Sequence, residues 1–186
     1  MTKAIGVFGS AFDPIHFGHI DCLQQIQNEY ELIIVVPSFA HAFGKQMADY
    51  DLRVQSVTSA VNEACDSFAN RVLVSDIERV IAQQKQNSPV YTFDVLLAIA
   101  EKFGTDDLDF VVGPDNANPT QWARFYRSKD ILQRWGIKAV EERCNIRSSL
   151  IRNMISDNES LHDLSQLVPD NVLNDIKQHN LYGYKQ

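Results

Sequence analysis

Hydrophobic residues along the chain fall into two patterns that alternate with each other. Short, mainly apolar runs predict five strands, at residues 5–8, 32–36, 72–74, 108–112 and 137–140. Such runs are typical of a parallel sheet that is buried on both faces. Between the runs, apolar residues recur every three or four positions, which predicts helices.

Three apolar stripes predict helices between the strands, and two more helices follow the last strand. The stripes comprise Leu23, Ile26 and Tyr30; Leu52, Val57, Val61, Ala64 and Phe68; and Phe93, Leu96, Leu97, Ala100 and Phe103. The later helices are predicted at 148–155 and 171–181, with Asp170 as the N-cap of the second. Strand and helix in repetition predict one doubly wound α/β domain with right-handed crossovers over residues 1–186. Its small C-terminal helical part is expected from about residue 146.

Charge and cysteine content narrow the class of protein. The chain has 186 residues and a net charge of −7, which disfavours nucleic acid as a partner. Cys22, Cys65 and Cys144 are too widely spaced for a zinc site and fit free thiols in a reducing cytoplasm. The sequence has no signal-peptide pattern and no run long enough to span a membrane. We therefore expect a cytoplasmic protein without a membrane partner.

The segment GVFGSAFDPIHFGHI, residues 6–20, begins within the first predicted strand and continues beyond its end. Ligands of open α/β sheets bind beyond the carboxyl ends of strands, and a helix start there offers N–H groups and a positive dipole end. Gly9 allows close approach of a ligand, and His16 and His19 share one side of the first helical turn. Each feature alone is commonly a simple turn or a packing histidine. Together they predict a phosphate site, without the GxGxxG or P-loop pattern.

A second candidate phosphate site is IRSSLIR, residues 146–152. Ser148 and Ser149 can cap a helix and turn their hydroxyl groups toward a phosphate. Arg152 follows one turn later and can reach the same anion with its planar guanidinium. Taken alone, the two serines are an ordinary N-cap.

These two segments resemble the signatures of the nucleotidylyltransferase superfamily, GxFDPxHxGH and ISSTxIR. Within it, other segments are similar to the nicotinate (or nicotinamide) mononucleotide adenylyltransferases. They are FGKQMADYDLRVQSV, VYTFDVL, VVGPDN with the following Trp122, and LVPDNVLNDIKQHNLYG. The resemblance covers nearly the whole chain. It departs at Arg147, which replaces the first serine of ISSTxIR, in the short connection 137–146 and in residues 39–43.

The resemblance implies a Rossmann-like nucleotidyltransferase fold and transfer of AMP from ATP to the 5′-phosphate of a pyridine mononucleotide. It implies Mg²⁺ bound with ATP and no metal site of the protein itself. The implied catalytic residues are His16, His19, Lys45 and Arg152. The implied ATP-binding residues are Phe8, Gly9, Ser10, Phe12, Asp13, Gly18, Gly113, Asp115, Ile146, Ser148 and Ser149, and the implied substrate-binding residues are Arg53, Tyr91, Thr92 and Trp122.

Nicotinate mononucleotide is the expected acceptor, and two alternatives stay open. One is a related transferase that acts on nicotinamide mononucleotide, phosphopantetheine or another phosphate. The other, of a different class, is a nucleotide-binding regulatory module without catalysis. A homo-oligomer is also left open.

Overall fold

The computed structural model describes residues 3–40, 46–86, 88–113 and 118–185. Its centre is a parallel sheet with the strand order β3-β2-β1-β4-β5. The strands are β1 (Lys3–Ser10), β2 (Tyr30–Pro37), β3 (Val72–Val74), β4 (Leu108–Val112) and β5 (Gly136–Ala139). Each lies where the sequence predicts a strand, so the doubly wound α/β fold is confirmed.

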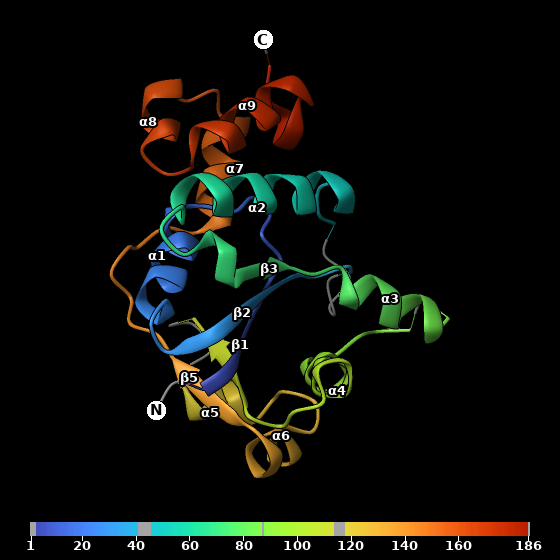
Figure 1. Cartoon of the computed structure of the whole chain (residues 1–186). Helices are drawn as coiled ribbons and strands as arrows, with labels where there is room; N and C mark the ends of the chain where they lie inside the picture. Colours follow the sequence, from blue (N-terminus) through green and yellow to red (C-terminus); the bar gives the residue numbers. More distant parts are fainter. Residues whose placement is uncertain (1–2, 41–45, 87, 114–117, 186) are drawn as a thin grey trace.

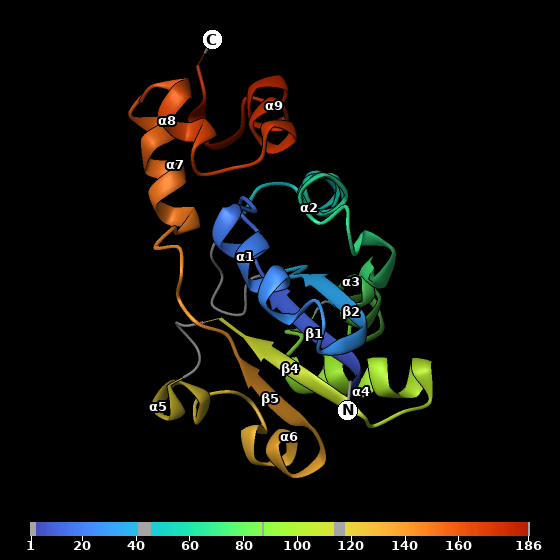
Figure 2. The same cartoon turned by 60° about the vertical axis from the view of Figure 1, so that its left-hand side comes forward.

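Helices cover both faces of this sheet (Figures 1 and 2). Their bounds are α1 (Phe17–Ile26), α2 (Tyr50–Ala64), α3 (Ile77–Gln84), α4 (Thr92–Phe103), α5 (Pro119–Trp122), α6 (Ser128–Arg134), α7 (Ser148–Ser156), α8 (Leu161–Ser165) and α9 (Asp170–Gln178), with 3₁₀ turns η1 (Ala69–Arg71) and η3 (Leu181–Gly183). Among the residues that the structure describes, no helix is long and apolar enough to cross a membrane.

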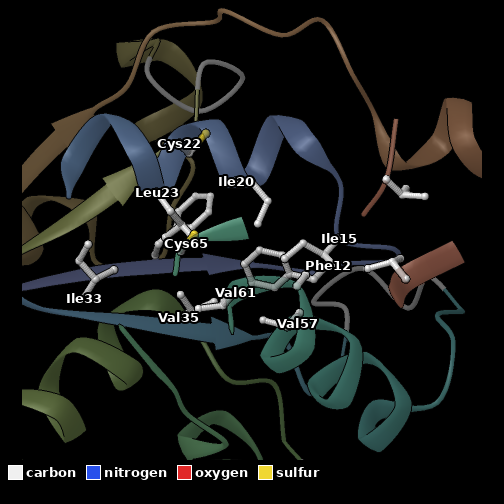
Figure 3. Packing of buried hydrophobic residues seen from close by; sticks show 14 of the residues in the cluster. Phe12, Ile15, Ile20, Cys22, Leu23, Ile33, Val35, Val57, Val61 and Cys65 are labelled. Atoms are coloured by element: carbon white, nitrogen blue, oxygen red, sulfur yellow. The ribbon is translucent and has the colours of Figure 1, made fainter. Parts of the chain in front are cut away.

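Two hydrophobic cores form because successive strand residues point to opposite faces. On β2, Ile33 and Val35 pack in one core, and Ile34 and Val36 pack in the other. The first core receives residues of α1, α2 and α7 to α9, and the second receives residues of α3 to α6. Figure 3 shows the first core, where side chains of α1 and α2 meet those of β2. The C-terminal helices therefore share a core with the helix that follows β1.

Several details differ from the sequence prediction. Tyr30 begins β2 instead of continuing the first helix. Its ring packs against Gly6 so closely that a Cβ at Gly6 would lie only 2.7 Å from the ring. Asp170 is the first residue of α9, because Pro169 takes the N-cap position. Phe103 ends α4 with 39% of its surface exposed, so it lies outside the core. Leu181 belongs to η3, beyond the end of α9.

A buried polar cluster joins the strands at their amino ends. Asp109 of β4 accepts a hydrogen bond from the Tyr30 hydroxyl (2.9 Å) and forms an ion pair with Lys3 (2.6 Å). The carboxylate of Asp109 occupies the space that a Cβ at Gly136 would need. Glycine is therefore the residue that lets β5 lie beside Asp109.

Gly136→Ala is expected to lower the free energy of unfolding by about 1–3 kcal/mol, the usual cost of overpacking. Urea denaturation measures the change. Gly9→Ala is the matched control, because the nearest atoms to its new Cβ would lie 3.7 Å away, at an ordinary contact distance. Equal stability of Gly136→Ala and the wild type would contradict this account of the cluster.

Candidate active site

A cleft of about 220 Å³ opens at the carboxyl ends of the central strands. Strand order reverses between β1 and β4, and ligands of open α/β sheets bind at such a switch point. The cleft is lined by the end of β1, the end of β4, the first turns of α1 and the segment between β5 and α7. The lining residues are Phe8, Gly9, Ser10, His16, Gly18, His19, Asp21, Cys22, Gly113, Glu141, Glu142, Arg143, Cys144, Ile146, Arg147 and Ser148.

Two histidine rings lie against each other at the start of α1. His16 is the N-cap residue and His19 lies in the first turn, with ring centroids 3.8 Å apart. A Cβ at Gly18 would lie 3.0 Å from Nδ1 of His16, closer than side-chain contacts normally allow. Glycine between the histidines therefore leaves room for the His16 ring to fold back over the helix start.

The local hydrogen bonds orient the His19 ring. The backbone N–H of His16 donates to Nδ1 of His19 (3.3 Å). Because Nδ1 accepts, the neutral ring carries its proton on Nε2, which lies 3.3 Å from the Ser10 hydroxyl. His19 thus directs an N–H donor toward the end of β1, where a phosphate oxygen can accept it.

Both imidazoles are held in their neutral form. Burial, with the nearby Arg147 guanidinium as a second cause, lowers the pKa of His16 to about 4. Burial also lowers the pKa of His19 well below its usual value, with His16 as a second cause. The rings of Phe8 and Phe12 lie beside His19, with centroids 6.3 and 4.8 Å away. The free site therefore offers hydrogen-bond donors to phosphate instead of two fixed positive charges.

The lowered pKa of His16 makes stability depend on pH. An unfolded histidine binds a proton near pH 6.5, whereas folded His16 binds one only near pH 4. Between these values the unfolded state takes up more protons, so stability is lost as the pH falls through this window. We expect about 2 kcal/mol of His16-dependent loss between pH 6.5 and 4.5. Urea denaturation of wild type and His16→Gln at both pH values isolates this part, because the carboxyl groups titrate in both proteins. An equal loss in the two would contradict it.

Contacts from the C-terminal part of the chain, called the brace below, hold the loop between β1 and α1 in place. Asp13 is 1% exposed, and its Oδ1 accepts from the Tyr182 hydroxyl and the Ala48 N–H, both at 3.0 Å. Nη1 of Arg152 donates to the Asp13 carbonyl (2.6 Å) and lies 3.7 Å from Oδ2. The Ser148 hydroxyl donates to the carbonyl of Pro14 (3.0 Å). Residues of α7 and η3 thus fix the backbone that leads into His16.

Two further sets of contacts fix the same region, one at the start of α1 and one from the side chain of Arg53. The sequence suggested unpaired N–H groups at the helix start, but the Phe17 N–H donates to the Leu167 carbonyl (3.0 Å). The reason is that the segment before α9 packs against this turn. Arg53, 3% exposed, donates through Nη1 to Ala11 (2.7 Å) and through Nε to Ala48 (2.9 Å).

The structure brings most of the predicted nucleotide residues together. The cleft gathers Phe8, Gly9, Ser10, His16, Gly18, His19, Gly113, Ile146 and Ser148. Phe12 and Asp13 are buried, Arg152 is in the brace, and Ser149 is exposed on α7. Lys45 and Asp115 lie outside the described residues. Arg147, which the sequence analysis did not select, lines the cleft, and its position one residue before the two serines was the available signal.

Of the predicted acceptor residues, Tyr91 and Thr92 lie at the start of α4, whereas Arg53 and Trp122 lie on other helices. Tyr91 is 37% exposed and packs on Tyr126, which is 51% exposed, with ring centroids 4.7 Å apart. Thr92 is the first residue of α4. Trp122 is buried in the second core and stacks on Phe125, at 4.6 Å. The sequence analysis did not select Tyr126, because its pairing with Tyr91 joins residues far apart in the chain.

Removing the Tyr182 hydroxyl tests the brace. In Tyr182→Phe, Oδ1 of Asp13 loses one of its two donors while staying buried. We expect the free energy of unfolding to fall by about 1.5–3 kcal/mol, the range for a hydrogen bond to a charged group. Tyr184→Phe is the control, because Tyr184 packs against the same core. Equal losses in the two variants, measured by urea denaturation, would argue against a specific role of Asp13.

Neutral histidines at the start of a helix, beside the strand-order reversal of a parallel sheet, suit the binding of nucleotide phosphates. The protein is a nucleotidyltransferase enzyme. The family model described as Cytidylyltransferase-like matches residues 7–154, and the chain belongs to this family. The resemblance seen in the sequence is thereby confirmed, and the alternative of a module without catalysis is set aside.

Relatives extend over the full length of the chain. A probable nicotinate-nucleotide adenylyltransferase of Staphylococcus epidermidis is 24% identical, with 100% of both chains covered. The nicotinate-nucleotide adenylyltransferase of Bacillus subtilis is 23% identical, covering 97% of this chain and 98% of its own. A solved Vibrio parahaemolyticus structure, provisionally named a nicotinate-nucleotide adenylyltransferase, is 28% identical with a TM-score of 0.80, covering 97% and 96%. The fold is also that of the Plasmodium falciparum nicotinic acid mononucleotide adenylyltransferase complexed with NaAD, at 19% identity and a TM-score of 0.75, with 98% of both chains covered.

Proposed function

We propose that the protein transfers AMP from ATP to nicotinate mononucleotide, giving deamido-NAD and pyrophosphate as a step of NAD biosynthesis. The observation that carries the proposal is the pair of neutral histidines packed at the start of α1, in the cleft at the strand-order reversal. The names of the full-length relatives support the acceptor. A second acceptor, nicotinamide mononucleotide, differs from nicotinate mononucleotide only by an amide in place of a carboxylate.

The reaction asks for positioning and for stabilisation of charge. The acceptor phosphate is already a nucleophile at neutral pH, so the site needs no general base. Its oxygen attacks the α-phosphorus of ATP, and the bond to the β,γ-pyrophosphate breaks. His19 donates from Nε2 to a phosphate oxygen, and His16 and the positive end of the α1 dipole stabilise the charge that develops. Gly9 and Ser10 lie beneath the nucleotide at the end of β1.

Magnesium enters this proposal as the counter-ion of ATP. Within the described parts of the chain, no group of three or more histidine, cysteine or acidic residues is arranged to hold a metal ion. Because Mg²⁺ prefers phosphate oxygens and water, we propose that it binds mainly through ATP. When bound, Mg²⁺ neutralises charge on the phosphates.

The acceptor side is proposed to lie at the start of α4. Tyr91 and Tyr126 expose ring surface for a pyridine, whereas the Trp122 ring is buried beside Phe110. Thr92 lies at the positive end of the α4 dipole, which favours a nicotinate carboxylate over an uncharged amide. Arg53 contributes by holding the loop backbone at Ala11 and Ala48.

Pyrophosphate release with Mg²⁺ and ATP tests the proposal, with nicotinate mononucleotide, nicotinamide mononucleotide and phosphopantetheine as separate acceptors. Preference for nicotinate mononucleotide is the expected result. Preference for another acceptor would overturn the proposed substrate while leaving the transferase class intact.

His19→Ala is expected to lower kcat by about 10²–10³-fold, the usual effect of losing an oriented donor to a transition state. Circular dichroism and urea denaturation verify that the variant is folded. His162→Ala is the control, since His162 is exposed on α8. Full activity of folded His19→Ala would remove His19 from the mechanism.

A further inference from the structure

Arg147 occupies a position in the cleft that the proposed mechanism has not used. It is the N-cap residue of α7, with extended backbone (φ −130°, ψ 136°), and so it lies just before the first helical turn. It lines the cleft with His16 and His19, and its positive charge acts on the His16 ring. The side chain therefore brings a cation to the place where the histidines offer uncharged donors.

The contacts of Arg147 hold it at the rim of the cleft. Nη2 pairs with Glu142 at 2.5 Å, and Nη1 donates to the carbonyl of Ile146 at 3.1 Å. Both members of the ion pair are partly exposed, at 37% and 41% of their side-chain surfaces. Ion pairs of this exposure contribute little free energy. A nucleotide phosphate with more charge than one carboxylate can therefore compete for the guanidinium or share it with Glu142.

Arg152 differs from Arg147 in its surroundings. Its Nη1 bonds to the Asp13 carbonyl inside the brace, and Arg152 is absent from the described lining of the cleft. From α7, the arginine side chain that borders the cleft is Arg147. A guanidinium can bind two phosphate oxygens at once, which suits a triphosphate better than a single phosphate.

We propose that Arg147 is a further catalytic residue of this chain, which binds the β- and γ-phosphates of ATP and stabilises the departing pyrophosphate. The role of Arg147 in pyrophosphate departure rests on the proposed function, whereas its role in ATP binding does not. Glu142 holds the guanidinium at the rim in the free enzyme, and Arg152 acts as a positioning residue through Asp13.

Calorimetric binding of ATP and of AMP, without an acceptor, tests the proposal. In Arg147→Met we expect ATP to bind roughly 10- to 100-fold more weakly, the loss of one or two charge-assisted hydrogen bonds. AMP should bind almost unchanged, because it lacks the β- and γ-phosphates. Unchanged ATP binding, or equal weakening of ATP and AMP, would overturn the proposal.

Two further variants separate the proposed contact from the effects of charge and folding. Lys138→Met removes one positive charge from β5, where Lys138 pairs with Glu29 at 2.7 Å outside the cleft, and it should leave ATP binding unchanged. Arg147→Lys keeps the charge without the planar fork and should bind ATP with intermediate affinity. ATP binding by Arg147→Lys as weak as that of Arg147→Met would count against a charge contact.

The outcome for Arg147 is distinguishable from that for the proposed function. If Arg147→Met binds ATP more weakly and the wild type does not use nicotinate mononucleotide, the proposed acceptor is overturned and the role of Arg147 in ATP binding is supported. If Arg147→Met binds ATP normally and turns over nicotinate mononucleotide, the proposed function is supported and the role of Arg147 is overturned. Thermal unfolding of each variant identifies a loss that comes from misfolding.

Discussion

The geometry of the site depends on the contacts of the buried Asp13 carboxylate. Burying an ionised carboxylate costs several kcal/mol unless hydrogen bonds and an opposite charge offset it. Here the offset comes from three separate parts of the chain: the Ala48 N–H before α2, the Tyr182 hydroxyl in η3 and the Arg152 guanidinium of α7. Because no single element satisfies the carboxylate, these parts must assemble together for the loop to be stable. The loop in turn fixes where His16 begins α1.

This constraint links the C-terminal helices to the candidate active site. They share a hydrophobic core with α1 and α2, and they reach the loop through the Ser148 hydroxyl, the Leu167 carbonyl and Tyr182. Tyr182 has a positive φ of 58°, a strained backbone for a residue other than glycine. Strain of this kind persists where surrounding contacts hold it, and the bond to Asp13 is such a contact.

The sequence predicts the strands and the pairing of the two histidines well because both depend on local patterns. Apolar runs locate all strands of the sheet, and the spacing of His16 and His19 correctly places them together. Short elements escape prediction: α5 and α8 have 4 and 5 residues and depend on tertiary packing. The contacts of Arg152 show the same limit. Its chemistry fits a phosphate, yet its contact with Asp13 joins residues 139 positions apart, which no local pattern reveals.

Electrostatics explain how a chain with a net charge of −7 can offer a site for a polyanion. The field in a cleft is set by nearby groups more than by the total charge of the protein. Buried histidines contribute donors without the desolvation cost of charged rings, since their lowered pKa values keep them neutral. A bound triphosphate would favour protonation of the same rings, because an adjacent anion raises a histidine pKa. The free enzyme thus avoids burying a cluster of positive charges, and the substrate supplies the negative charge that would make such a cluster stable.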